Sequence, residues 1–136
     1  MAAAHGMIAV DTNVLVRFIA RDDARQAAIA GALIAERSVY ISSGVLMETE
    51  WVLRANFGWS RDRINTALGD LLSLETVATD DPAMTLWTLA RHAAGADLAD
   101  MLHLVAAQRT EGFATFDSTL ATDAGRDAPV RVETLR

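Results

Sequence analysis

The 136-residue sequence contains no cysteine and no lysine, and it has only two prolines. Without cysteine, disulfides, thiolate metal sites and cysteine nucleophiles are excluded, which fits a reducing cytoplasm. Without lysine, the chain cannot build a P-loop nucleotide site, a Schiff base or the lysine-assisted aspartate of phosphotransfer enzymes. Arginines interrupt every apolar run before the roughly 18 residues that a membrane helix needs, so we expect a soluble, cytoplasmic protein without a membrane partner.

Acidic residues outnumber basic ones, and the formal net charge is -6. Spread evenly, this charge would repel a phosphate backbone, because nucleic-acid binding normally depends on a positive surface. The conclusion reverses if several acids converge on divalent cations. Two bound Mg²⁺ would bring the total from -6 to -2 and make the site itself attractive to phosphate.

The length and the 51% hydrophobic content suit one domain with a substantial core. No Gly/Ser-rich linker, low-complexity tract or fixed-period repeat divides the chain. The first residues, MAAAHG, lack the long apolar region of a signal peptide. We therefore expect a single domain over residues 7–136, with residues 1–6 as a leader outside the fold.

Short apolar runs alternate with longer helical patterns along the chain. This order implies an α/β fold with three layers: a mostly parallel central sheet of four to five strands, covered by helices on both faces. The predicted strands are 7–10, 39–41, 75–78, 112–115 and 130–132. The predicted helices are 13–20, 22–36, 43–57, 60–73, 82–94 and 98–110, with a short helix after Asp117.

Two acids follow predicted strands directly. Asp11 comes after MIAV and Asp117 comes just after GFAT, and parallel sheets bind their ligands at the carboxyl ends of strands. The alternative for each is a helix N-cap, a role that Asp favours and that contributes about 1 kcal/mol. Thr12 and Asn13 could orient the carboxylate of Asp11 or a metal-held water, or they could be ordinary turn residues.

Four further acids stand in predicted helices or at their starts. Periodicity does not separate Glu48 from Glu50, since each lies among apolar neighbours at three- and four-residue spacings. In GADLADMLHLVAAQ, Asp97 is expected to be an N-cap and Asp100 to lie in the first helical turn. His103 could touch substrate, although a histidine without a second His or Cys is poor evidence for a metal site.

Four motifs in this order resemble those of PIN-domain nucleases, and specifically of the VapC toxins of bacterial VapBC toxin–antitoxin pairs. The resemblance covers nearly the whole chain from Met7. It rests on AVDTNVLVRF, VLMETEWVLR, ADLADMLHLVAA and GFATFDSTLA.

Carried over position by position, the family's catalytic and metal-binding acids fall on four residues. These are Asp11, Glu48, Asp100 and Asp117. Asp97 matches a less uniform acidic position and is retained as a fifth candidate metal ligand. The resemblance selects Glu48 over Glu50, since the family acid stands three residues before the Trp-Val-Leu run. Thr12, Asn13 and Thr115 are the expected supporting residues.

The resemblance implies the toxin component of a type II toxin–antitoxin system. Its activity would be that of an endoribonuclease dependent on Mg²⁺, with Mn²⁺ as a substitute. The expected partners are RNA, a cognate VapB-type antitoxin and a second copy of the chain in a homodimer. Hard carboxylate oxygens suit such metals, and metal-activated water suits phosphodiester hydrolysis.

Two other functions remain open at this point. The first is a non-catalytic PIN-like binding domain that uses its acids to dock a basic partner. The second is a haloacid-dehalogenase-like phosphatase, which also begins with a strand followed by Asp. For that enzyme class, the usual second acid is replaced here by Asn13 and the required lysine is missing.

Overall fold

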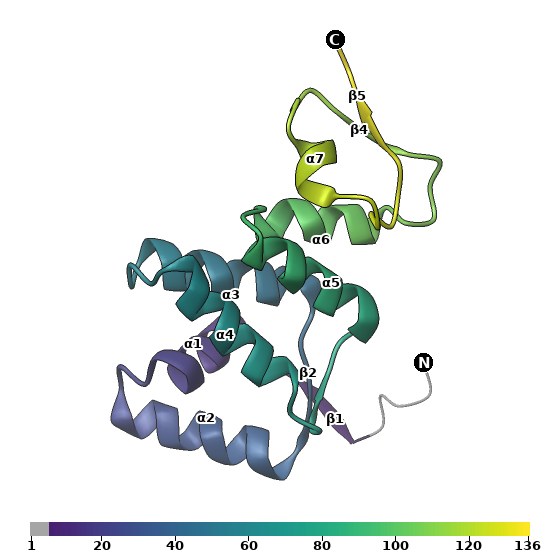
Figure 1. The fold of residues 1–136 in the computed structure, drawn as a ribbon. Coiled ribbons are helices and arrows are strands. Elements are labelled where there is room, and N and C mark those ends of the chain that lie inside the picture. Colours follow the sequence, from purple (N-terminus) through teal and green to yellow (C-terminus); the bar gives the residue numbers. More distant parts are fainter. Residues whose placement is uncertain (1–5) are drawn as a thin grey trace. The chain divides into compact units, whose positions relative to one another are not determined.

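The structure is a computed structural model that describes residues 6–136. It contains two compact units, an N-terminal unit that ends at Asp80 and a C-terminal unit over Asp81–Arg136 (Figure 1). Of the expected leader, residues 1–5 lie outside the described residues. No helix in the described part of the chain is both long enough and apolar enough to span a membrane.

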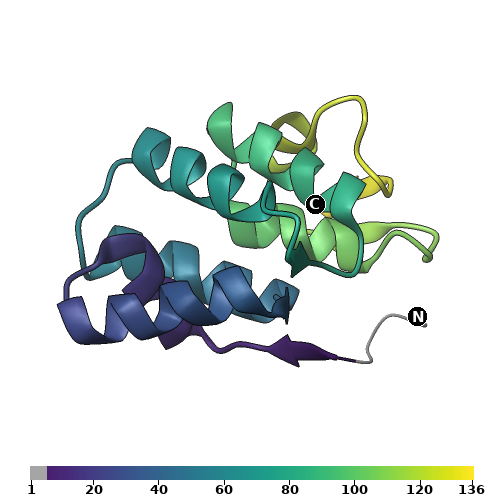
Figure 2. The ribbon, with the colours of Figure 1, turned by 90° about the horizontal axis from the view of Figure 1, so that it is seen from below.

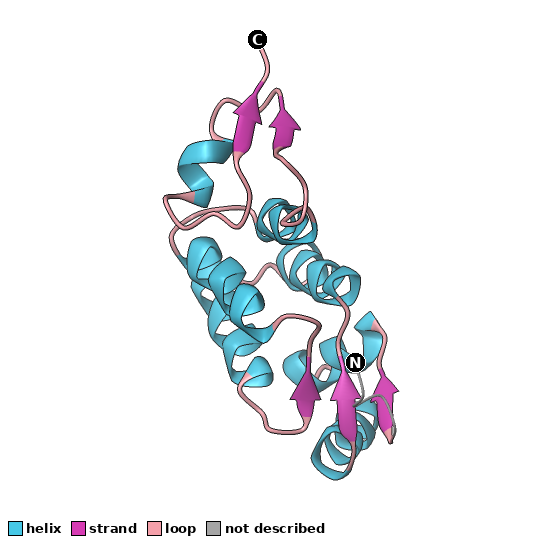
Figure 3. Ribbon diagram, turned by 90° about the vertical axis from the view of Figure 1, so that its right-hand side faces the viewer, coloured by secondary structure: helices cyan, strands magenta, loops and turns pink. Residues whose placement is uncertain are grey.

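The N-terminal unit contains a parallel sheet in the order β1-β2-β3, with two helices in each crossover. Figure 3 shows these three strands side by side, pointing the same way. The register pairs Ile8 with Val39 and Val39 with Val77. The elements of this unit are β1 (Met7–Ala9), α1 (Thr12–Ala20), α2 (Ala24–Glu36), β2 (Ser38–Tyr40), α3 (Ser43–Ala55), α4 (Arg61–Leu72) and β3 (Val77–Ala78).

Every helix of the N-terminal unit begins at a polar side chain that accepts a backbone hydrogen bond. Asp11, Asp23, Ser42 and Ser60 are the N-caps of α1, α2, α3 and α4. Such caps satisfy N–H groups that have no partner within the helix. The sequence therefore specifies where each helix starts as well as which face it buries.

The helices of the N-terminal unit pack through apolar side chains. α1 lies beside α2, as Figures 1 and 2 show, and also packs on α3, which in turn contacts α4. Leu15, Leu53, Ile64 and Leu68 are completely buried. This packing places the start of α1, which Asp11 caps, next to α3, which contains Glu48.

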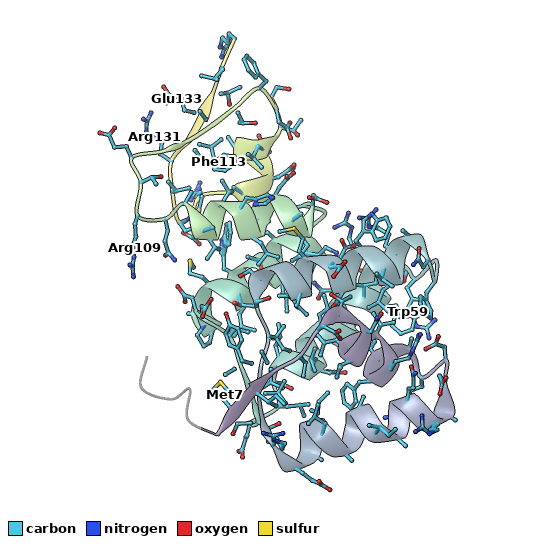
Figure 4. The ribbon with its side chains drawn as sticks, turned by 180° about the vertical axis from the view of Figure 1, so that it is seen from behind. Met7, Trp59, Arg109, Phe113, Arg131 and Glu133 are labelled. Atoms are coloured by element: carbon cyan, nitrogen blue, oxygen red, sulfur yellow. The ribbon has the colours of Figure 1, made fainter. Side chains whose placement is uncertain are left out.

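The C-terminal unit has its own core. α5 (Pro82–Ala93) packs on α6 (Leu98–Ala106), and β4 (Phe113–Thr115) pairs in parallel with β5 (Val132–Thr134) through a crossover that contains α7 (Leu120–Ala124). Phe113, labelled in Figure 4, packs against this core. The buried residues of the core are Ala96, Met101, Leu104, Leu120, Ala124 and Val130.

The predicted α/β class, the five strands and the parallel pairing are all confirmed. The described strands nevertheless form two sheets, of three and two strands, where one sheet of four to five strands was predicted. The last strand is also two residues later than predicted. Val130 is apolar because it packs in the core, and the pairing begins where Phe113 N donates to Arg131 O at 2.8 Å.

The helix predicted over 98–110 ends at Ala106. Beyond it the backbone tightens, with Gln108 N donating to Val105 O at 3.2 Å. The Thr110 hydroxyl then donates to the carbonyl of Ala107 at 2.7 Å. This hydroxyl offers the backbone an alternative to another helical turn, which is a known tendency of threonine.

Candidate metal centre and active site

Asp11 follows β1 and is the N-cap of α1. Its Oδ1 accepts a hydrogen bond from Val14 N at 3.2 Å, and the residue is exposed. The capping role considered from the sequence is therefore present. It does not compete with metal binding, because the cap uses one carboxylate oxygen and a carboxylate has two.

Glu48 and Glu50 differ clearly in their surroundings. The hydroxyl of Thr12, the first residue of α1, donates to Glu48 Oε1. The Glu48 carboxylate is thus held beside the helix start that Asp11 caps. Glu50 is 5% exposed and accepts from Arg54 Nε at 2.8 Å. Since a buried carboxylate needs such a partner, Glu50 has a sufficient structural role, and only Glu48 lies next to the Asp11 segment.

The supporting residues have distinct places. Thr12 is buried and orients Glu48, as described above. Asn13 is exposed and lines a groove between α1 and α2. In the C-terminal unit, the Thr115 hydroxyl accepts from Asp117 N at 3.0 Å. Thr115 therefore fixes the backbone between the end of β4 and Asp117.

Asp97 and Asp100 lie at the start of α6 as predicted. Asp97 is the N-cap and accepts from Asp100 N at 3.0 Å. Burial raises the pKa of the Asp100 carboxyl, and the negative charges of Asp97, Asp117 and Asp123 raise it further, against a smaller lowering by His103. Carboxylates gathered in this way repel one another, and a cation would relieve the repulsion.

The pKa of Asp117 is shifted in the direction opposite to that of Asp100. Its Oδ1 accepts from Thr119 N at 2.9 Å and from the Thr119 hydroxyl at 2.8 Å. These hydrogen bonds lower the pKa of the Asp117 carboxyl, because they stabilise its charged form. In the absence of a cation, Asp100 therefore takes up a proton before Asp117 does.

Two contributors to this acidic group were missed from the sequence. Thr119 holds Asp117 through the two-residue spacing of an Asx turn, a signal that the DST motif contains. Asp123 lies in α7, four residues later, and its charge acts on Asp100. The sequence does not predict either role, because the boundaries of the short helix after Asp117 depend on how the chain turns there.

The described residues fit a divalent metal in donor chemistry. The candidates are carboxylates, the hard oxygen ligands that Mg²⁺ and Mn²⁺ prefer. They occur as two groups: Asp11 with Glu48 in the N-terminal unit, and Asp97, Asp100 and Asp117 in the C-terminal unit. Among residues 6–136, no set of three acidic or histidine side chains is close enough to form a complete metal site by itself.

The raised pKa of Asp100 predicts a pH-dependent stability in EDTA. The folded carboxyl holds its proton more tightly than the unfolded one, so stability falls as pH rises from about 3.8 through the folded pKa and stays lowered above it. We expect Asp100→Asn to melt at a higher temperature than the parent at pH 7, with the difference shrinking toward pH 3. Thermal unfolding between these pH values measures this.

Asp117→Asn provides the matched control for that experiment. The lowered pKa of Asp117 in the parent means that its ionised carboxylate stabilises the fold above the unfolded pKa. This stabilisation is lost as pH falls through the folded pKa. The two variants should therefore change the pH profile in opposite directions. A melting difference for Asp100→Asn that is constant over the pH range would contradict the assignment.

Comparison with known families identifies the fold. The family model of the PIN domain matches residues 8–124, which is most of the chain, so the protein belongs to the PIN-domain family. PIN domains are generally metal-dependent nucleases. The comparisons with curated proteins and with solved structures gave no significant match.

Proposed function

We propose that this PIN-domain protein is a VapC-type toxin, a Mg²⁺-dependent endoribonuclease of a type II toxin–antitoxin system in the cytoplasm. The observation that carries the proposal is the position of its acids. Asp11 follows β1 and Asp117 follows β4, and in each unit a helix supplies another acid, Glu48 or Asp100. Two strand-end acids, each with a helix acid in its own unit, supply the kind of carboxylate ligands that a metal-dependent nuclease centre requires.

Asp11, Glu48, Asp100 and Asp117 would hold the metal, with Asp97 as a fifth candidate ligand. When bound, divalent metal supplies activation of water and stabilisation of the negative charge that develops on the phosphate. The chain's own contribution is to prepare the ligands. Thr12 orients Glu48, and Thr119 keeps Asp117 ionised. Burial and the neighbouring carboxylates raise the pKa of Asp100, so its negative charge lowers stability, and a bound cation would relieve this effect.

A groove between α1 and α2 supports the proposal that the partner is an antitoxin with a basic, amphipathic segment. The groove has a volume of about 200 Å³. It is mainly apolar, and Ile29 on its rim is 56% exposed. Asn13, at one end, is two residues from Asp11, so a bound segment could extend an arginine toward the carboxylates. The net charge of -6 favours a basic partner. Titration with such an antitoxin should stop cleavage at a one-to-one ratio of chains. The proposal also includes a homodimer of this chain.

Removal of metal is the direct test of the enzymatic proposal. The purified protein should cleave single-stranded RNA with Mg²⁺ or Mn²⁺ and lose this activity completely in EDTA. Metal at 100 times its dissociation constant should also stabilise the fold by about 2.7 kcal/mol, because it binds only the folded state. RNA cleavage on gels and thermal unfolding with and without Mn²⁺ measure the two effects.

The same pair of measurements distinguishes the non-catalytic alternative. A protein that binds antitoxin tightly but shows neither cleavage nor a Mn²⁺-induced change in melting temperature would be a PIN-like binding domain. Metal stabilisation without cleavage of any RNA would instead retain the centre and reject the ribonuclease.

A further inference from the structure

Phe116 is the most exposed large apolar residue in the described part of the chain, with 79% of its surface accessible. It lies directly between Thr115, the last residue of β4, and Asp117. Aromatic side chains usually contribute to a fold by being buried. An aromatic ring in water beside a candidate ligand of the metal therefore needs an explanation other than packing.

The exposure of Phe116 does not come from a loose segment. On one side, Thr115 pairs with Thr134 in the sheet, and its carbonyl accepts from Leu135 N at 2.7 Å. On the other side, Asp117 N donates to the Thr115 hydroxyl, and Thr119 holds the Asp117 carboxylate. Hydrogen bonds thus fix the backbone on both sides of Phe116.

The strand pattern accounts for the direction of the ring. Alternate residues of a strand point to opposite faces. Phe113 is partly buried and packs on the core, while Ala114 is exposed. Phe116 is the first residue after β4, two positions beyond Ala114, and it is exposed as Ala114 is. The sequence specifies an aromatic ring on the solvent side at the end of β4.

We propose that Phe116 is a base-stacking residue, on which a base of single-stranded RNA lies when the adjoining phosphodiester is at the acidic centre. This inference rests on the proposed function and names the part of the substrate that the site grips. Consecutive Cα atoms are about 3.8 Å apart, so the ring stays within a nucleotide's reach of a phosphate held at Asp117. Unpaired RNA bases bind aromatic faces in this way, and stacking accepts any base.

Stacking also addresses the charge of the chain. A net charge of -6 does not by itself attract RNA over a distance. Contact between a base and an aromatic ring contributes affinity that does not depend on neutralising phosphates. A chain with few phosphate contacts should therefore bind RNA with a shallow dependence on salt.

The test combines a substitution of Phe116 in the protein with the removal of one base from the RNA. Phe116→Leu keeps an apolar residue and removes the aromatic face, and an abasic nucleotide on either side of the mapped scissile bond removes the partner. On intact RNA we expect Phe116→Leu to lower kcat/KM about tenfold, mainly by raising KM. On the abasic RNA that has lost the stacked base, parent and variant should be equal. Phe116→Trp should restore the parent's value.

Leu86→Ala is the matched control, because Leu86 is 56% exposed on α5 of the same unit. It should leave kcat/KM unchanged. The inference is overturned if Phe116→Leu cleaves as fast as the parent, if it loses the same factor on intact and abasic RNA, or if light scattering shows that it only disrupts a dimer.

A binding measurement separates this inference from the proposed function. Fluorescence anisotropy with a labelled RNA in Ca²⁺ reports binding whether or not the RNA is cut. Binding that needs Phe116 in a protein that never cleaves RNA would support stacking and reject the nuclease. Cleavage that is indifferent to Phe116 would support the nuclease and reject stacking.

Discussion

Asp11→Asn should lower the rate of RNA cleavage on the order of a thousand-fold while leaving the protein folded. Asn keeps the N-cap of α1, because its side-chain oxygen can accept from Val14 N as Asp11 does. It removes the negative charge that a divalent cation requires, and a thousand-fold loss corresponds to about 4 kcal/mol of transition-state stabilisation. Initial rates on a short RNA at saturating Mn²⁺ measure the loss.

Asp23→Asn is the matched control for this variant. Asp23 is the N-cap of α2 and accepts from Gln26 N at 2.9 Å, so it repeats the structural role of Asp11 within the same unit. It has no place in the proposed centre, and its substitution should leave cleavage unchanged. Equal activity of Asp11→Asn and the parent under the same metal conditions would remove the basis of the proposed mechanism.

Substitutions at Glu48 and Glu50 should have opposite consequences. Glu48→Gln should lower cleavage on the order of a hundred-fold with little change in stability, because Glu48 is exposed and its contact with Thr12 can persist. Glu50→Gln should lower the free energy of unfolding by about 1 kcal/mol, since it weakens the charge pair between the buried Glu50 carboxylate and the exposed guanidinium of Arg54. Cleavage per folded molecule should survive this second change.

Urea unfolding and single-turnover cleavage, carried out on both variants, measure these effects. The comparison is informative because the two residues are chemically identical and only two positions apart. If Glu50→Gln were inactive but stable, or Glu48→Gln active but unstable, the assignment of the two glutamates would be reversed.

Most of the fold could be predicted from the sequence because local signals agree with each other. Each helix start before α7 coincides with a capping Asp or Ser, and strands occur where short apolar runs follow helices. The errors arise where a side chain has a role that the local sequence pattern does not reveal. Val130 packs in the core without belonging to a strand, and the Thr110 hydroxyl competes with the end of α6. How strands are distributed between sheets depends on long-range pairing, which no local pattern encodes.

The candidate site was less predictable than the fold. Asp11 and Asp97 could be recognised as candidate metal ligands, but the capping hydrogen bonds explain each position equally well. Periodicity could not choose between Glu48 and Glu50, because the two glutamates differ in their contacts and not in their spacing. Thr12, which donates to Glu48, is distant in the sequence, whereas Arg54, which donates to Glu50, is one helical turn away. The role of Thr119 needed coordinates, since it depends on how the chain turns after β4.

Because Asp11 is the N-cap of α1 as well as a residue of the proposed metal centre, a loss of the proposed catalysis and a loss of the fold are expected to be separable in this protein. The change to Asn preserves the cap, so an inactive allele should still accumulate as a properly folded chain. The α1–α2 groove would be intact in that chain. Under the proposed function, such a molecule would act as a decoy that competes with active copies for the proposed antitoxin in the same cell.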